Sequence, residues 1–458
     1  MYYNISMTKI KEPAVANAFY SGNPAELKKQ LDDFSKQNGN SYEYRTRAVI
    51  VPHAGLVYSG ELAYEGISQL DKSIKNIFIF APAHRVPLGG LALSGYDEWK
   101  TPLGTLKVNQ KINAELEEKF EAKFFDEAFA EEHSVEVELP AIQHIFGDEV
   151  NIIPVLVGRA EPQKITDIIS EYYDNKEFGF IISSDLSHFH SDKDAQKIDG
   201  ETAKMIESGN IEELRYEQAC GAVGIYGLVE FANIRNFSLI RINLINSSLA
   251  SGDKSRVVGY GAWFLYEGSK NRFIKQYYSE YLLKLCRDVI LSKFNRVKLY
   301  TGHAPVFSQL GACFVTLKKN NNLRGCIGSI VAYQPLINDI VQHAQDAAFR
   351  DPRFNPVEQN EVESLTIDIS ILSEPKKMFF KDEQDLLEQI VPFKDGIIIK
   401  DKRYQAVYLP SVWEDLPDKT IFLNSLKMKA GLPADYFSDT FEAYRFSTVY
   451  IEERRSGD

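Results

Sequence analysis

The sequence predicts an α/β domain followed by a separate α+β domain. Strongly apolar runs such as Ile77–Phe80 are typical of strands buried on both faces of a sheet, and they alternate with amphipathic segments of helix length. Around Glu267–Arg272 this pattern gives way to hairpin-like segments. At 458 residues the chain is also long for a single core. We therefore expect domains at residues 1–267 and 275–458, joined by a linker over 268–274.

The first domain is predicted to contain a mixed sheet between helical layers. Its apolar strand segments are residues 47–52, 77–83, 151–157, 178–184 and 257–266. Apolar residues at helical spacing predict helices near 24–34, 61–70, 109–121 and 192–208. Strands that alternate with helices of this length form a parallel or mixed sheet that helices cover on both faces.

The second domain is predicted to combine helices with antiparallel strands. Its expected helices are residues 274–293, 335–349 and 417–430. Its expected hairpins join 314–317 to 323–327 and 397–400 to 406–409. The alternation of apolar and polar residues over 365–371 predicts a half-buried strand.

Composition restricts the partners and the compartment. A net charge of −12 leaves no large basic surface for a nucleic acid backbone. The four cysteines form no C-x-x-C pair, which suits a reducing compartment. The N-terminus has no apolar signal segment, and no stretch reaches about 18 continuous apolar residues. We expect a cytoplasmic protein without nucleic acid or membrane partners.

Three of the predicted strands run directly into a histidine: His53, His84 and His188. Ligands of open α/β sheets bind beyond the carboxyl ends of the strands, so these imidazoles are candidates for one shared site. Asp185 adds a carboxylate, and Tyr58 follows His53 in a glycine-containing loop. Two histidines with a carboxylate suit non-haem Fe(II), and the same ligands can hold Zn²⁺. The alternative is that each histidine is only hydrogen-bonded to its own loop.

His133 is a further candidate, as a catalytic proton carrier. Acidic residues flank it in Glu131–Pro140, and they would favour its charged form. The alternative is the start of a helix whose glutamates are solvated. The sequence leaves both interpretations open.

These motifs resemble the Memo family (mediator of ErbB-driven motility), whose prokaryotic members are called AmmeMemoRadiSam system protein B. The resemblance covers about residues 8–267 and rests on four segments that occur in order: Pro52–Gly55, Pro82–His84, Glu132–Glu136 and Ser184–His188. It implies the fold of the class III extradiol dioxygenases, a mixed sheet between helical layers.

The resemblance also implies roles for single residues. His53 and His84 match the two metal-binding histidines, and His188 matches the catalytic acid/base histidine. The dioxygenases supply a glutamate as third ligand, and some Memo proteins have a cysteine there. The segment that we match to this place, Ser247–Ser251, has neither, so Asp185 or a residue outside the motif is expected to complete the metal site.

In the second domain, Leu323–Gly328 and Ala347–Phe354 resemble the AMMECR domain, or AmmeMemoRadiSam system protein A, over about residues 275–455. Arg324 and Cys326 are its candidate functional residues, because a nearby positive charge stabilises a thiolate. The alternative is a small residue packed in a tight strand. The name of the system implies a radical S-adenosylmethionine protein as partner, which must be a separate chain, since this sequence has no C-x-x-x-C-x-x-C motif.

Three functions follow as hypotheses. The first is a dioxygenase-like enzyme that uses a divalent metal ion, Fe(II) by resemblance, on an unknown small molecule or peptide. The second is a scaffold that retains the dioxygenase pocket without catalysis. The third is a zinc-dependent hydrolase, which would act without oxygen.

Overall fold

The structure is a computed structural model, and it describes residues 8–37, 44–295 and 304–453. The chain forms two compact units, residues 1–270 and 271–458. Helix α9 (Lys270–Leu291) starts four residues before its predicted position. Residues 270–274, expected to belong to a linker, are therefore helical.

The first unit is built on a mixed sheet with twelve strands among the described residues. Four adjacent parallel strands form its centre, in the order β8 (Asn151–Val157), β3 (Asn76–Pro82), β9 (Phe178–Ser183) and β2 (Ala48–Val51). Strand β12 (Val257–Tyr266) pairs antiparallel to β2 and continues the sheet. All five strands were predicted, because each is a long apolar run.

The remaining strands extend this centre on both sides. They are β1 (Ile10–Lys11), β4 (Leu91–Leu93), β5 (Glu98–Thr101), β6 (Gly104–Val108), β7 (Lys123–Phe124), β10 (His188–His190) and β11 (Ser238–Asn246). Strand β6 is parallel to β8, whereas β10 and β11 are antiparallel to β12. The predicted fold class, a mixed sheet with helices and a separate second domain, is confirmed.

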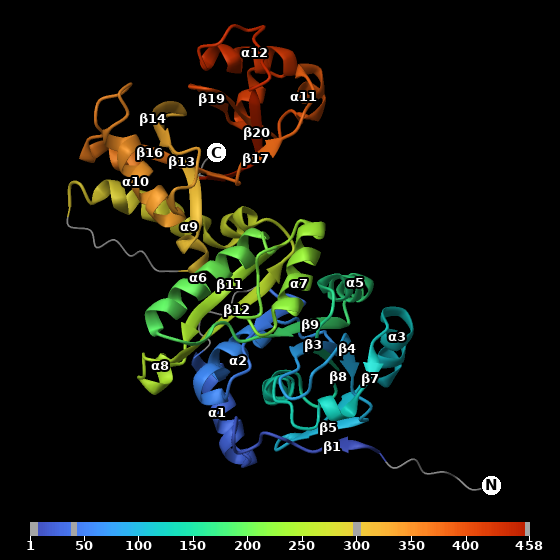
Figure 1. The fold of residues 1–458 in the computed structure, drawn as a ribbon. Helices are drawn as coiled ribbons and strands as arrows, with labels where there is room; N and C mark the ends of the chain where they lie inside the picture. The colour runs from blue at the N-terminus through green and yellow to red at the C-terminus, as the bar shows by residue number, and fades with distance from the viewer. Residues whose placement is uncertain (1–7, 38–43, 296–303, 454–458) are drawn as a thin grey trace. The chain divides into compact units, whose positions relative to one another are not determined.

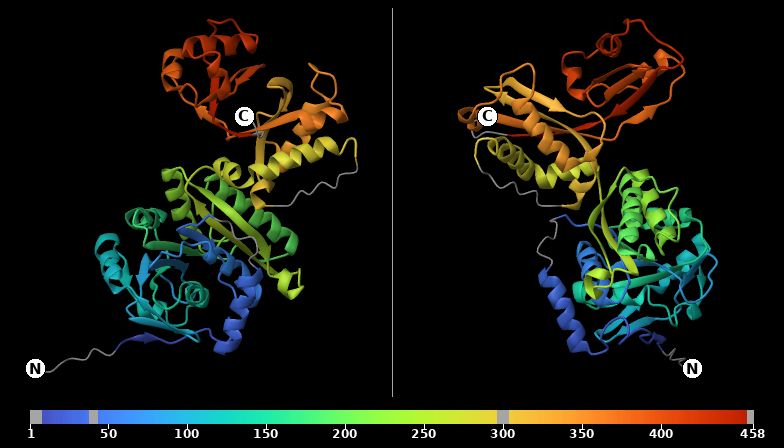
Figure 2. Two further views of the ribbon diagram at one scale, coloured as in Figure 1. Left: turned by 180° about the vertical axis from the view of Figure 1, so that it is seen from behind. Right: turned by 60° about the vertical axis from the view of Figure 1, so that its left-hand side comes forward.

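Helices cover both faces of this sheet (Figures 1 and 2). One layer consists of α1 (Pro24–Gln37), α2 (Glu61–Ser68) and α4 (Leu139–Phe146), which pack on one another. The opposite layer includes α3 (Gln110–Phe120), α5 (Pro162–Tyr173) and α7 (Ala222–Arg235), and α6 (Asp192–Ser208) packs on β11 and β12. Because side chains alternate along a strand, Phe78 and Phe80 face the second layer and join its apolar core.

A buried carboxylate attaches the N-terminal segment to the turn that precedes α4. Glu136 is 1% exposed and accepts hydrogen bonds from the backbone N–H groups of Ala14 and Val15 and from the hydroxyl of Tyr20. Its fourth partner is the ammonium group of Lys11, at 2.9 Å and equally buried. Glu136 is thus not a solvated surface residue, which was one of the two interpretations of its motif.

The second unit contains two sheets. The first runs β14 (Asn322–Gly328), β13 (Leu310–Lys319), β16 (Leu365–Leu372), β21 (Thr448–Glu452), with the short β15 (Gln334–Pro335) beside β13. The second runs β17 (Lys376–Met378), β20 (Glu442–Phe446), β18 (Gly396–Asp401), β19 (Tyr404–Tyr408). Helices α9 and α10 (Leu336–Phe349) form a core with the first sheet, whereas α11 (Glu383–Gln389) and α12 (Lys419–Lys429) form one with the second.

Strand β14 contains the motif Leu323–Gly328 and packs directly on helix α10. A Cβ atom on Gly325 would lie 2.1 Å from the carbonyl oxygen of Ala347, inside that helix. No side chain fits there without moving the helix backbone. The glycine at this position is therefore required by packing.

Among the described residues, we find no helix long and apolar enough to cross a membrane.

We predict that Gly325→Ala destabilises the second unit by about 3 kcal/mol, because either β14 or α10 must move. Hydrogen–deuterium exchange of peptides from β14 and α10 should report the loss of protection. Gly200→Ala is the control, because a Cβ there meets nothing within 4 Å and lies in helix α6. Unchanged exchange at α10 in Gly325→Ala would contradict the proposed tight contact.

Candidate metal centre

The candidate site lies where β2, β9 and β3 end. These strands are neighbours in the sheet and parallel, so their carboxyl ends meet at one edge. His53 follows β2, His84 follows β3, and His133 comes from the loop before α4. One ring nitrogen of each histidine lies within 4.8 Å of the others, in a group that could hold a metal ion. His53 and His84 are thus brought together as predicted, and His133 joins them.

A single carboxylate holds two of these histidine loops. Glu132 is 1% exposed, and its Oε2 accepts the backbone N–H of His84 at 2.6 Å. Its Oε1 accepts the backbone N–H groups of His133 and Ser134 at 2.9 and 3.1 Å. The same Oε1 lies 3.0 Å from His84 Nδ1. Glu132 therefore fixes both loops and orients one imidazole, and the sequence analysis did not single it out.

The ionisation of Glu132 follows from these contacts. Burial opposes its charge, but the side chains of His133 and His84 and the backbone N–H groups outweigh burial and lower its pKa far below the usual range. Glu132 is therefore a carboxylate at neutral pH, and this favours Nδ1–H as the donor from His84. The other nitrogen of His84, Nε2, is then left with its lone pair.

A hydrogen bond at one ring nitrogen orients His53 as well. Its side chain is buried, and Nδ1 lies 2.8 Å from Ser183 Oγ. That hydroxyl also lies 2.7 Å from the carbonyl oxygen of Ser134 and 2.9 Å from Glu138 Oε1. Since the hydroxyl can donate to the carbonyl oxygen, we assign the proton of His53 to Nδ1. Burial and then the neighbouring imidazoles lower the pKa of His53 well below its usual range, so the ring is neutral, as a metal ligand must be.

The free nitrogen of His53 faces Cys220. The Cys220 Sγ atom lies 3.3 Å from His53 Nε2 and accepts the backbone N–H of Asp185, also at 3.3 Å. Burial and then Asp185 raise the pKa of this thiol, so without a metal ion Cys220 is protonated. The cysteine precedes α7 and follows no strand, so the strand-end pattern did not select it.

Ser247–Ser251, the segment matched to the third ligand of the relatives, contains no cysteine or glutamate in this chain. Ser247–Ser251 enters the short helix α8 (Ser248–Ser251), in which no residue is buried. Cys220, from a different segment, lies beside His53 instead. Cys220 is thus a candidate for the residue outside the motif that the sequence analysis left open.

Asp185 was predicted either to bind the metal or to orient a ligand, and its role as a metal ligand stays a prediction. It is buried and belongs to the same loop region, but it is not a member of the group of three histidines. Its Oδ1 accepts the backbone N–H of His53 at 2.9 Å. Burial raises the pKa of Asp185 to about 7, against these backbone hydrogen bonds. In this structure Asp185 positions the loop of His53.

His188 and Tyr58 surround the group without belonging to it. His188 is half-buried on β10, paired with Val258 of β12. Burial is the main cause of its lowered pKa, and the charge of His84 contributes, which places His188 within electrostatic reach of the site. Tyr58 lies in a single π-helical turn after His53 and is 44% exposed. The catalytic roles given to His188 and His133 stay predictions.

Comparison with known proteins assigns a family to each of the two domains. Residues 11–264, over half of the chain, match the Memo-like protein family. The chain belongs to the Memo family. Residues 283–451 match the AMMECR1 family, so the second unit carries an AMMECR1 domain.

Relatives of the Memo domain come from archaea, bacteria and mammals. The MEMO1 family proteins of Thermoplasma acidophilum and Aquifex aeolicus are 32% and 29% identical, and each alignment covers 55% of this chain and 97% of the relative. Protein MEMO1 of Homo sapiens is 36% identical over 187 residues, which are 39% of this chain and 63% of that protein. A crystal structure of an uncharacterised protein from Pyrococcus horikoshii is 28% identical and covers 38% of this chain and 89% of its own, with a TM-score of 0.35.

In the AMMECR1 domain, Arg324 and Cys326 have separate partners. The Arg324 guanidinium lies 3.0 Å from Glu361 and also donates to the carbonyl oxygen of Asn355. The backbone N–H of Cys326 donates to Asp351, which is paired with Arg353 at 2.7 Å. Arg324 is therefore paired with Glu361, whereas Arg353 donates to the carbonyl oxygen of Cys326. The functional roles of Arg324 and Cys326 stay predictions.

A second group of potential metal ligands lies in the core of the AMMECR1 domain: Cys313, Asp339 and His343, all buried. Both carboxylate oxygens of Asp339 are already occupied. Oδ2 accepts from the backbone N–H of Cys313 and the hydroxyl of Ser329, and Oδ1 accepts from Gln334. These contacts explain the group as a buried hydrogen-bond network.

We predict that Glu132→Gln lowers the free energy of unfolding at pH 7 by about 3 kcal/mol, because an amide leaves some buried N–H donors without an acceptor. Since the folded pKa of Glu132 is depressed, its contribution is complete above about pH 4.5 and is lost as the pH falls below that value. Chemical unfolding at several pH values should show the difference from wild type shrinking below pH 4.5. Glu131→Gln, at an exposed neighbour, is the control and should change little. A difference that stays constant down to pH 3 would contradict the assignment.

Proposed function

We propose that the Memo domain is a metal-dependent enzyme of the dioxygenase-like type, with Fe(II) as its metal. The observation that supports this most directly is the convergence of three imidazoles, from three separate loops, to within 4.8 Å. A family resemblance to extradiol dioxygenases supports the choice of iron.

The residues present fit a bound cation. His53 and His84 each have one ring nitrogen engaged, by Ser183 and by Glu132, as is usual for histidines that bind a metal through the other nitrogen. His133 is the third candidate ligand, and Cys220 the fourth, because a bound cation lowers the pKa of a nearby thiol. Bound Fe(II) would supply oxygen activation, and bound Zn²⁺ would supply an activated water.

The surrounding residues would manage protons and water. His188 is half-buried with a lowered pKa, so at neutral pH it is an unprotonated base that can accept a proton from a substrate hydroxyl. Asp185, with a pKa near 7, exists in both forms at that pH. The loops on Glu132 hold the imidazoles before substrate arrives, which reduces the reorganisation needed during reaction.

A zinc hydrolase is the second candidate, and one observation favours it. The group contains three histidines and no carboxylate, a composition found in catalytic zinc sites. The two candidates differ in their need for oxygen, since a hydrolase acts anaerobically.

A partner protein is also part of the proposal. Fusion of the Memo and AMMECR1 domains in one chain supports joint action, and the name of the resembling system points to a radical S-adenosylmethionine protein. Co-purification with such a protein that survives loss of His53 and His84, while no turnover is found, would favour the scaffold function instead.

We predict that the purified chain, loaded anaerobically with Fe(II), binds about one equivalent of metal. His53→Ala/His84→Ala should lose at least about 90% of it, because two of the ligands are removed. His144→Ala is the control, since the ring of His144 is hydrogen-bonded to Tyr64 and Asp32 and does not belong to the group of three histidines. Elemental analysis measures the ratio. Equal metal content in wild type and the double variant would exclude a metal site formed by His53 and His84.

We also predict oxygen-dependent turnover of catechol-like compounds by the iron-loaded chain. Oxygen uptake and the absorbance of ring-opened products are the readouts, with anaerobic reactions as the control. His188→Gln should lower kcat by about 100-fold or more while metal content is unchanged, since general base catalysis typically contributes this much. Metal-dependent ester cleavage without oxygen would assign the hydrolase instead.

A further inference from the structure

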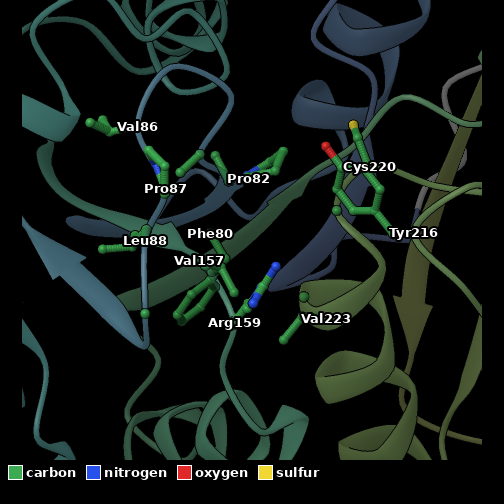
Figure 3. A pocket seen from close by; sticks show the side chains of 16 residues that line it. Phe80, Pro82, Val86, Pro87, Leu88, Val157, Arg159, Tyr216, Cys220 and Val223 are labelled. Atoms are coloured by element: carbon green, nitrogen blue, oxygen red, sulfur yellow. The ribbon is translucent and has the colours of Figure 1, made fainter.

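A large cavity lies beside the candidate metal centre. Its volume is about 750 Å³, within the range of small-molecule sites. Three segments form its walls: the end of β3 with the following loop, the end of β8, and the segment from Tyr216 into α7 (Figure 3). The cavity touches the metal centre through Cys220, which is one of its lining residues and lies 3.3 Å from His53.

The lining is mostly apolar, and Arg159 is its one charged residue. Phe80, Val157 and Val223 are typical of its walls, and Arg159 is the single charged residue among the sixteen that line it. In the part of the chain that the structure describes, the Arg159 guanidinium has no hydrogen-bonding or acidic partner. Figure 3 shows this side chain reaching into the cavity from the end of β8. Arg159 is exposed to solvent, and it supplies the only charge among the lining residues.

The backbone beneath Arg159 is firmly held. The N–H of Arg159 donates to the carbonyl oxygen of Leu88 at 2.8 Å, and its carbonyl oxygen accepts the N–H of Gly90 at 3.0 Å. A Cβ atom on Gly158 would lie 2.1 Å from the same Leu88 oxygen, so the two walls are in direct backbone contact. The backbone of Arg159 is therefore already ordered. This lowers the conformational entropy that is lost when the guanidinium binds a ligand.

The wall toward the metal centre carries the other polar groups. These are the hydroxyl of Tyr216, an exposed residue, and the thiol of the buried Cys220, both labelled in Figure 3. No carboxylate lines the cavity to compete for Arg159.

We propose that this cavity binds a molecule with an apolar body and an oxyanion, either carboxylate or phosphate. Arg159 pairs with the oxyanion, because a guanidinium matches its two oxygens with parallel hydrogen bonds. The apolar body then lies between Phe80 and Val223 and extends toward Cys220. The inference that this ligand is the substrate rests on the proposed function; the inference that it binds does not.

Binding of small fluorescent probes tests this on the metal-free full chain. The probes are 2-naphthoate, 2-naphthyl phosphate and the neutral 2-naphthamide, which share one apolar body. Wild type should bind at least one of the two anions about tenfold or more tightly than the amide. Arg159→Met should remove that difference and leave amide binding unchanged, whereas Arg85→Met, which removes a cation outside the lining, should behave as wild type. Whichever of the two anions binds more tightly shows whether the cavity prefers a carboxylate or a phosphate.

A blocking variant separates the cavity from the surface. Val223→Trp fills space beside Arg159 and should weaken all three probes, with thermal unfolding as the check of folding. Equal binding of anions and amide by wild type, an equal loss for all probes in Arg159→Met, or no binding at millimolar concentration would each overturn the proposal. Because the protein is metal-free, anion binding in a chain that shows no metal-dependent turnover would support the cavity and reject only the proposed function.

Discussion

The candidate site depends on the hydrogen bonds that the Glu132 carboxylate accepts. Two loops that leave different parts of the sheet carry His84 and His133, and neither loop has a strand partner at that point. Glu132 supplies the missing acceptors to both, through backbone N–H groups and one imidazole. Its charge is maintained in a buried place because every contact is with a donor. The positions of the His84 and His133 loops follow from this one ionised side chain.

The sequence predicted the central strands and the two strand-end histidines for a simple reason. A long apolar run shows both the strand and the point at which it ends, and parallel neighbours end at the same edge. The N-terminal helix and the long helix after the first domain were equally visible, from their apolar spacing. Element ends were less certain, as the early start of α9 shows.

The residues that sequence reasoning missed depend on contacts between distant segments. Cys220 reaches His53 because α7 packs under β9, and no local pattern marks it. Glu132, Glu136 and Glu138 occur in a segment that reads equally well as a solvated helix start, yet all three are 1% exposed. Their donors come from residues as far away as Lys11 and Ser183, so their burial is a property of the tertiary structure. The same holds in the AMMECR1 domain, where Gly325 packs on α10 and Arg324 pairs with Glu361.

The pairing of β2 with β12 has a consequence for synthesis of the protein. Strand β2 ends at Val51, and the strand that covers its open side begins at Val257. About 200 residues must therefore leave the ribosome before this apolar edge is closed, which takes roughly 10–40 s at ordinary elongation rates. During that interval the edge can pair with other chains, so the nascent Memo domain is a natural client for chaperones. The AMMECR1 domain begins to emerge only as that closure becomes feasible, which separates the folding of the two domains in time.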